Sequence, residues 1–160
     1  MYDQSKQANG SISNTSTQAQ AAVDEFVKYL SDKQVPLENI EIISGLLVEI
    51  ISWQTMASIE QAMDKEDKRR WDEFLKTDPN DAQQLVALDE FYKNKKNKGL
   101  EDLQNEITIK IVKSARSQID NQGTVIEKIS GLDDEQVEKA LDLVNNGDLK
   151  KAEEIIGLSF

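Results

Sequence analysis

A long apolar segment near residues 37–63 constrains the fold more than any other feature of the chain. Its apolar side chains recur around nearly the whole circumference of a helix instead of along one stripe. They are Ile40, Ile42, Ile43, Leu46, Leu47, Val48, Ile50 and Ile51, and Trp53, Met56, Ile59 and Met63 continue one side. A helix that is apolar all round lies at the centre of a bundle or in a large interface. The segment therefore predicts an all-α protein in which this helix is central to a bundle or part of a large interface.

Gly45 interrupts this apolar segment. A residue without a side chain either lets a neighbouring helix come close or is simply tolerated at that position. The sequence leaves both alternatives open.

The rest of the chain predicts further amphipathic helices, each with apolar residues three or four positions apart on one face. They are expected at about residues 17–34, after Asp64, between Asp78 and the lysine run 93–98, at 100–119, at 124–129, after Asp133 or Asp134, and between Asp148 and Gly157. No run of alternating apolar and polar residues predicts a strand.

Three short motifs set expected helix boundaries. Asp64 begins an acidic turn and should cap the helix that follows it. Asp78 should cap the next helix, with Pro79 at the first helical position, where proline is favoured. Gly99 follows four lysines and should supply the left-handed cap that ends this helix.

The predicted elements divide into three parts: a polar arm (1–17), a helical bundle (18–119) and a small C-terminal unit of three helices (120–160). Thirteen of the first 20 residues are Ser, Thr, Asn, Gln or Gly, so the arm cannot bury enough apolar surface to order itself. The arm is therefore expected to be disordered, or to become ordered only against a partner.

The acidic charge of the chain limits the surfaces it can bind. Thirty acidic and 19 basic residues give a net charge of −11, which repels phosphate backbones and anionic membranes. Residues 1–20 contain no apolar leader, and no uninterrupted apolar run reaches the roughly 20 residues of a bilayer span. We expect a cytoplasmic protein that binds neither nucleic acid nor membrane.

The chain contains no histidine and no cysteine. Thiolate nucleophiles, disulfides, zinc fingers and the commonest general base are therefore absent. The acids Asp64, Glu66 and Asp67 lack the spacing of a calcium loop and are interpreted as a helix cap. These absences predict a protein that is not an enzyme and has no catalytic residue, cofactor or metal.

Residues 120–160 resemble the UBA-like (ubiquitin-associated) family of three-helix domains. The matching residues are Ile126, Ile129, Ser130, Gly131, Leu132, Ala140, Leu141, Asn145, Asn146, Leu149, Ala152, Ile155 and Ile156. The loop Ser130-Gly131-Leu132 stands where the family carries Met-Gly-Phe or a similar sequence, and the second loop is one residue longer. The resemblance implies a small fold that binds ubiquitin or another protein surface. The alternative is that amphipathic helices simply end an ordinary bundle.

Residues 40–111 are similar, in the order of their elements, to small acidic helical bacterial domains with no assigned function. An apolar helix is followed by an acidic helix start, a Trp-x-x-Phe-Leu turn and an Asp-Pro helix start. This similarity implies no activity.

Seven residues are candidates for contacts with a partner: Ser130, Gly131, Leu132, Leu158, Trp71, Lys95 and Lys96. Trp71 is a binding hot spot if its helix face is exposed, and a core residue otherwise. The lysine run that contains Lys95 and Lys96 is either a solvated helix end or a contact for an acidic partner.

We therefore expect a non-catalytic protein-interaction or adaptor protein. It would bind protein partners, or a second copy of itself as a homodimer, through apolar helix faces. The alternative is a structural subunit of a larger assembly, such as a phage or secretion complex, whose N-terminal arm orders on its neighbours.

Overall fold

The computed structural model describes residues 16–159, and these form eight α-helices without a strand. The helices are α1 (Ser16–Asp32), α2 (Leu37–Ala62), α3 (Lys65–Leu75), α4 (Asp81–Lys96), α5 (Leu100–Asn121), α6 (Gly123–Ser130), α7 (Asp134–Asn145) and α8 (Leu149–Ile156). The predicted all-α fold is confirmed. The polar arm predicted for 1–17 falls almost wholly outside the described residues, and Ser16 and Thr17 belong to α1.

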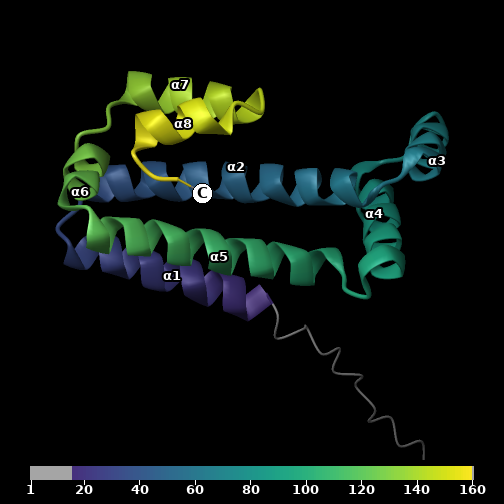
Figure 1. The fold of residues 1–160 in the computed structure, drawn as a ribbon, viewed down its shortest axis with the longest axis horizontal. Coiled ribbons are helices and arrows are strands. Elements are labelled where there is room, and N and C mark those ends of the chain that lie inside the picture. Colours follow the sequence, from purple (N-terminus) through teal and green to yellow (C-terminus); the bar gives the residue numbers. More distant parts are fainter. Residues whose placement is uncertain (1–15, 160) are drawn as a thin grey trace, which may run out of the picture.

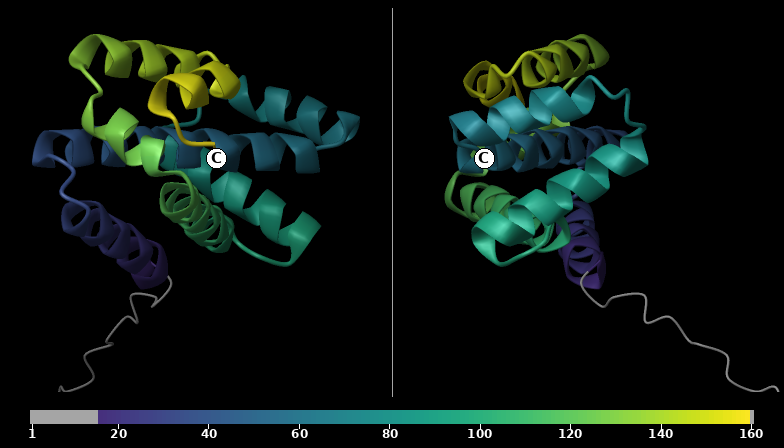
Figure 2. Two further views of the ribbon diagram at one scale, coloured as in Figure 1. Left: turned by 60° about the vertical axis from the view of Figure 1, so that its left-hand side comes forward. Right: turned by 90° about the vertical axis from the view of Figure 1, so that its right-hand side faces the viewer.

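The long helix α2 is the centre of the molecule. Figure 1 shows α2 running along its length, with α1 and α5 on one side and α7 and α8 on the other. α6 lies near one end of α2, while α3 and α4 lie at the opposite end. The two further views in Figure 2 keep α7 and α8 on the side of α2 away from α1. Of the two alternatives for this helix, the structure shows the central position.

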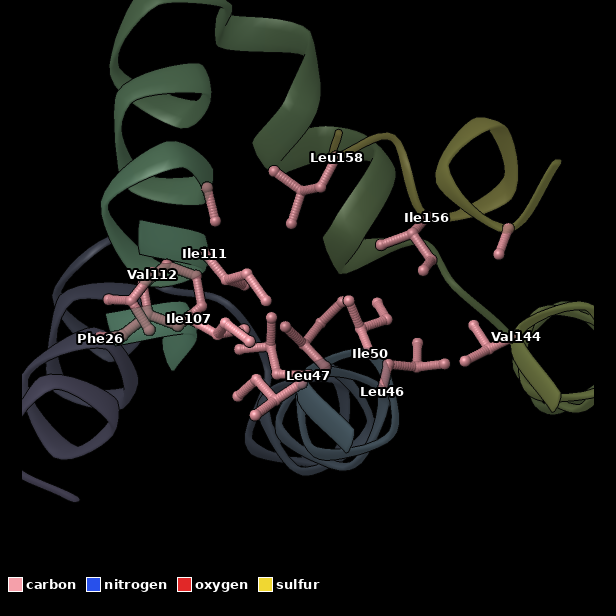
Figure 3. Packing of buried hydrophobic residues seen from close by; sticks show 14 of the residues in the cluster. Phe26, Leu46, Leu47, Ile50, Ile107, Ile111, Val112, Val144, Ile156 and Leu158 are labelled. Carbon is pink, nitrogen blue, oxygen red and sulfur yellow. The ribbon is translucent and has the colours of Figure 1, made fainter. Parts of the chain in front are cut away.

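Side chains from both sides of the bundle meet on α2. In Figure 3, Leu47 lies beside Ile107 and Ile111 of α5, while Leu46 points toward Val144 of α7. All five side chains are at most 8% exposed and belong to one continuous apolar cluster. The C-terminal helices thus complete the same core that α1 and α5 begin.

The apolar composition of α2 also suits a membrane-spanning segment. By length and composition, α2 is the one helix among residues 16–159 that could cross a membrane. The core helix of a soluble protein passes the same test, and nine residues of α2 are buried. Its central position therefore accounts for only part of its apolar composition, and the absence of a membrane partner stays a prediction.

Two of the three predicted boundary motifs are placed differently in the structure. α4 is capped by Asn80 instead of Asp78, because the Asn80 side chain and Gln83 exchange hydrogen bonds of 2.9 Å with each other's backbone N–H groups. Asp78 has a φ of 57° and ends the preceding turn, so Pro79 precedes the cap. These contacts correct the predicted Asp78 cap by two residues.

The left-handed residue that ends α4 is Asn97, with a φ of 56°, and not Gly99. Gly99 has a φ of −79° and instead stands at the N-cap of α5. A Cβ atom at Gly99 would lie 2.9 Å from Oδ1 of Asp89. Gly99 therefore serves the close approach of the Asp89 side chain and not a positive φ.

Candidate functional site

The short helix α3 touches the core through one side chain, because Trp71 is partly buried and packs against the apolar cluster. None of its 11 residues is buried, although its sequence carries Trp71, Phe74 and Leu75. The rings of Trp71 and Phe74 lie 5.3 Å apart and are partly exposed, and Leu75 is 40% exposed. An isolated helix of this length is only marginally stable in water, so its few attachments decide whether it forms.

Polar contacts hold the start of α3 against the end of α4. The carboxylate of Asp64 accepts hydrogen bonds from the backbone N–H groups of Glu66 and Asp67, both at 2.9 Å. Nζ of Lys95 lies 2.6 Å from Asp67 and 3.2 Å from Asp64. The predicted Asp64 cap is confirmed. Lys95 joins two helices, and its contact with an acidic partner stays a prediction.

These contacts perturb the ionisation of the groups that make them. The backbone N–H of Asp67, and then the Lys95 ammonium, hold the pKa of Asp64 at about 2. Hydrogen bonds to Asp67 and Asp64 raise the pKa of Lys95 in turn. The contacts therefore favour the charged forms of both Asp64 and Lys95 at the α3–α4 junction.

The exposed charges of α3 balance one another. The helix carries four acidic and four basic residues. Arg69 lies 2.5 Å from Glu66 and 2.6 Å from Glu73, and Arg70 lies 3.3 Å from Glu66. In a chain of net charge −11, α3 is therefore a locally neutral element.

Hollows surround the aromatic pair. A cleft of about 340 Å³ lies between Met56 and Met63 of the α2 end and Trp71 of α3. Another of about 460 Å³ is lined by Phe74 and Val86. Both hollows are open to solvent, so they are features of the surface and not voids in the core.

We call Met56, Trp71, Phe74 and Val86 the α3–α4 surface. Met56 is 45% exposed and Val86 is 59% exposed, while the two rings are partly exposed. The sequence placed these residues on apolar helix faces but could not show that those faces stay uncovered. The one available signal was the unusually wide apolar face of α4, where Val86 follows Leu85 directly.

The predicted partner residues separate into two regions. Trp71 belongs to the α3–α4 surface, Lys95 supports it, and Lys96 is exposed nearby on α4. The other four lie in the C-terminal part of the chain: Ser130 is partly buried, Gly131 is exposed, and Leu132 and Leu158 are buried.

The burial of Leu132 corrects the expectation that it contacts a partner. Its side chain is 7% exposed, and its carbonyl accepts a hydrogen bond of 3.1 Å from Nδ2 of Asn39 in α2. The same Asn39 amide donates to the Ile129 carbonyl at 3.0 Å. The loop at 130–132 is thus turned onto α2.

Leu158 is likewise a core residue, with 1% of its surface exposed. The backbone of the next residue, Ser159, forms two hydrogen bonds with the side-chain amide of Gln118 in α5. The Ser159 N–H donates to the amide oxygen of Gln118 at 2.8 Å, and the amide nitrogen of Gln118 donates to the Ser159 carbonyl. Because the C-terminal segment is folded back onto α5, the Leu158 side chain offers nothing to a partner.

Comparisons with family models, with curated proteins and with solved structures find no match to this chain. The UBA-like resemblance of residues 120–160 therefore stays a prediction. Among residues 16–159, no group of three or more acidic side chains is arranged to hold a metal ion.

Proposed function

We propose that the protein is a non-catalytic protein-binding protein whose partner covers the α3–α4 surface. The observation that supports this proposal is that α3 carries two aromatic residues and a leucine but buries none of its residues. Large aromatic side chains on a surface are the usual anchors of protein interfaces. Because Trp71 is only partly buried against the core, a partner that covered Trp71, Phe74 and Val86 would add to the packing that α3 has within its own chain.

The chemistry of the surface suits an apolar helix face of another polypeptide. α3 is electrically neutral, so net charge does not select the partner there. The clefts beside Trp71 and Phe74 can take inserted aliphatic side chains, which is how helices bind in hydrophobic grooves. Specificity would then come from the shape of the two clefts.

A matched pair of variants tests this proposal. Val86 and Leu85 are neighbours in α4 with 59% and 60% exposure, but Val86 lines the cleft beside Phe74 and Leu85 does not. We expect Val86→Lys to abolish capture of the specific partner, because it places a charge in an apolar interface. Leu85→Lys should leave capture unchanged.

The measurement is quantitative affinity capture from the native cell with the wild type and both variants, followed by light scattering of each purified protein. A protein lost only with Val86→Lys is the expected partner. A dimer that is lost only with Val86→Lys would identify the partner as a second copy. Equal capture and equal mass for all three proteins would refute the proposal.

A further inference from the structure

A second surface lies on α2, away from the aromatic residues of α3. Glu41, Gly45, Val48 and Ser52 follow the three- and four-residue spacing of one helix face, and all four are exposed. Val48 is 59% exposed although it belongs to the most apolar helix of the protein. We call these four residues the α2 strip.

No contact within the chain explains why position 45 is a glycine. A Cβ atom built at this position meets nothing within 4 Å, so no neighbouring helix requires the glycine. Glycine in a helix interior is less favourable than alanine. Gly45 therefore weakens α2 without improving the packing of the protein. A glycine at this position is explained if the backbone of another molecule approaches the α2 strip closely.

A cleft opens beside the α2 strip, between α1, α2 and α5. Its volume is about 280 Å³, and its walls include Val23 of α1, together with Val48 and Ile51 of α2. Asn105 of α5 also lines it. The lining also includes polar side chains such as Gln20, Gln104 and Thr108, so the part that suits an inserted aliphatic side chain is the patch formed by Val23, Val48 and Ile51.

Asn105 carries an unsatisfied hydrogen-bond donor at this cleft. The residue is 8% exposed, and its Nδ2 atom has no hydrogen-bond partner among the described residues. A buried amide without an acceptor is costly, and native structures rarely keep one without a reason. Because the Nδ2 atom is itself buried, an oxygen atom from the cleft would satisfy it only after the Asn105 side chain turns toward the cleft.

The charge of α2 selects the partner. α2 carries Glu38, Glu41, Glu49 and Glu60, all of them exposed, and it contains no lysine or arginine. A cationic segment would be attracted to these glutamates, whereas a second copy of this chain would bring the same four carboxylates and a further net charge of −11.

We propose that the α2 strip binds a basic amphipathic helix of another protein. Its backbone crosses α2 at Gly45, and one aliphatic side chain enters the cleft against Val23, Val48 and Ile51. Lysines or arginines on its flanks pair with the glutamates of α2, and the Asn105 side chain turns into the cleft to donate to a polar oxygen beside the inserted side chain. This surface is distinct from the α3–α4 surface and does not require it.

The test uses the full-length protein and a fluorescent helical peptide with a leucine stripe flanked by lysines. Controls are a scrambled peptide and a peptide with glutamate in place of lysine. We expect anisotropy to show binding of the first peptide only, weakening as salt is raised. In ¹⁵N spectra, the Gly45 amide and the Asn105 side-chain amide should shift.

Gly45→Ala gives the decisive readout. Removing an exposed helical glycine should raise the melting temperature of the free protein by about 2–4 °C, while the new methyl group weakens peptide binding by about tenfold. Gly123→Ala is the matched control, because a Cβ atom there also meets nothing within 4 Å. Val86→Lys should leave peptide binding intact, which separates this site from the α3–α4 surface.

Three results would overturn the proposal. The lysine peptide could bind no better than its scrambled form, which would show charge attraction alone. Gly45→Ala could raise the melting temperature without changing affinity, which would mark Gly45 as merely tolerated. Light scattering could show a dimer that Val48→Lys disrupts, which would make a second copy the occupant.

Discussion

Among single residues, Asn39 fixes more of the fold than its sequence context indicates. Its buried amide donates to the carbonyls of Ile129 and Leu132, which lie at and just beyond the end of α6. Carbonyl oxygens at a helix end have no partner within that helix. Asn39 therefore caps α6 from a different helix, 90 residues away along the chain.

Replacing Asn39 with alanine should destabilise the protein by about 1–3 kcal/mol, because two carbonyl groups lose their buried donor. Urea unfolding followed by circular dichroism measures this loss. The exposed residue Asn94 provides the control, and Asn94→Ala should change the free energy of unfolding by about 0.5 kcal/mol or less. Equal effects of the two substitutions would contradict a capping role for Asn39.

Sequence reasoning could not find this contact, or the burial of Leu132 that goes with it. Periodicity shows which side chains of a helix are apolar, but Asn39 is polar and stands beside the apolar Ile40. The carbonyl groups that it binds belong to the backbone, which is the same for every residue type, so the sequence does not indicate them. Burial of Leu158 was equally hidden, because it depends on the fold-back of the chain after Gly157.

Among the helices, α3 depends most on charge. The pKa of Asp64 is held at about 2, below its ordinary value of 3.8, by the Asp67 N–H and by Lys95. A carboxyl group whose pKa is lower in the folded state stabilises that state above its ordinary pKa and loses the effect as the pH falls toward the lowered value. The stabilisation of α3 should therefore be complete above about pH 4 and disappear toward about pH 2.

We expect α3 to loosen within this pH range while the core around Ile50 remains folded. Amide shifts in nuclear magnetic resonance spectra, recorded from pH 5 to pH 2, would show α3 changing first. Asp64→Asn keeps a side chain that can cap the helix but removes the titrating charge, so it should flatten the profile of α3. An unchanged profile in Asp64→Asn would show that other carboxyl groups control the transition.

The helices also show where local rules succeed and where they compete. The bounds of α2 and α5 could be predicted to within about two residues, because long apolar periodicity and clear turns define both. At the start of α4 two local signals compete, and the reciprocal bonds of Asn80 and Gln83 prevail over Asp78-Pro79. The partial burial of Trp71 could not be predicted, because it depends on how α3 is placed against α2 and α4.

At the scale of the whole molecule, the two proposed surfaces suit an adaptor. The α2 strip is flanked by glutamates and favours a cationic helix, whereas the α3–α4 surface is apolar beside a neutral helix. Met56 lies one turn beyond Ser52 on the same face of α2 and lines the cleft beside Trp71. The two surfaces therefore approach each other at Met56, and partners bound to both would lie side by side.

The molecule should also unfold as one unit, because residues 120–160 complete the core on α2. Leu158 is 1% exposed in the same apolar cluster as Leu30 of α1 and Ala152 of α8. Leu158→Ala should therefore cost about 2–5 kcal/mol and lower the melting temperature by roughly 5–15 °C, whereas Ser159→Ala should have little effect. Hydrogen exchange is the discriminating measurement. A single cooperative unit predicts that Leu158→Ala lowers the protection of α1 and α8 amides equally, while an independent C-terminal domain would lose protection in α8 alone and leave α1 unchanged.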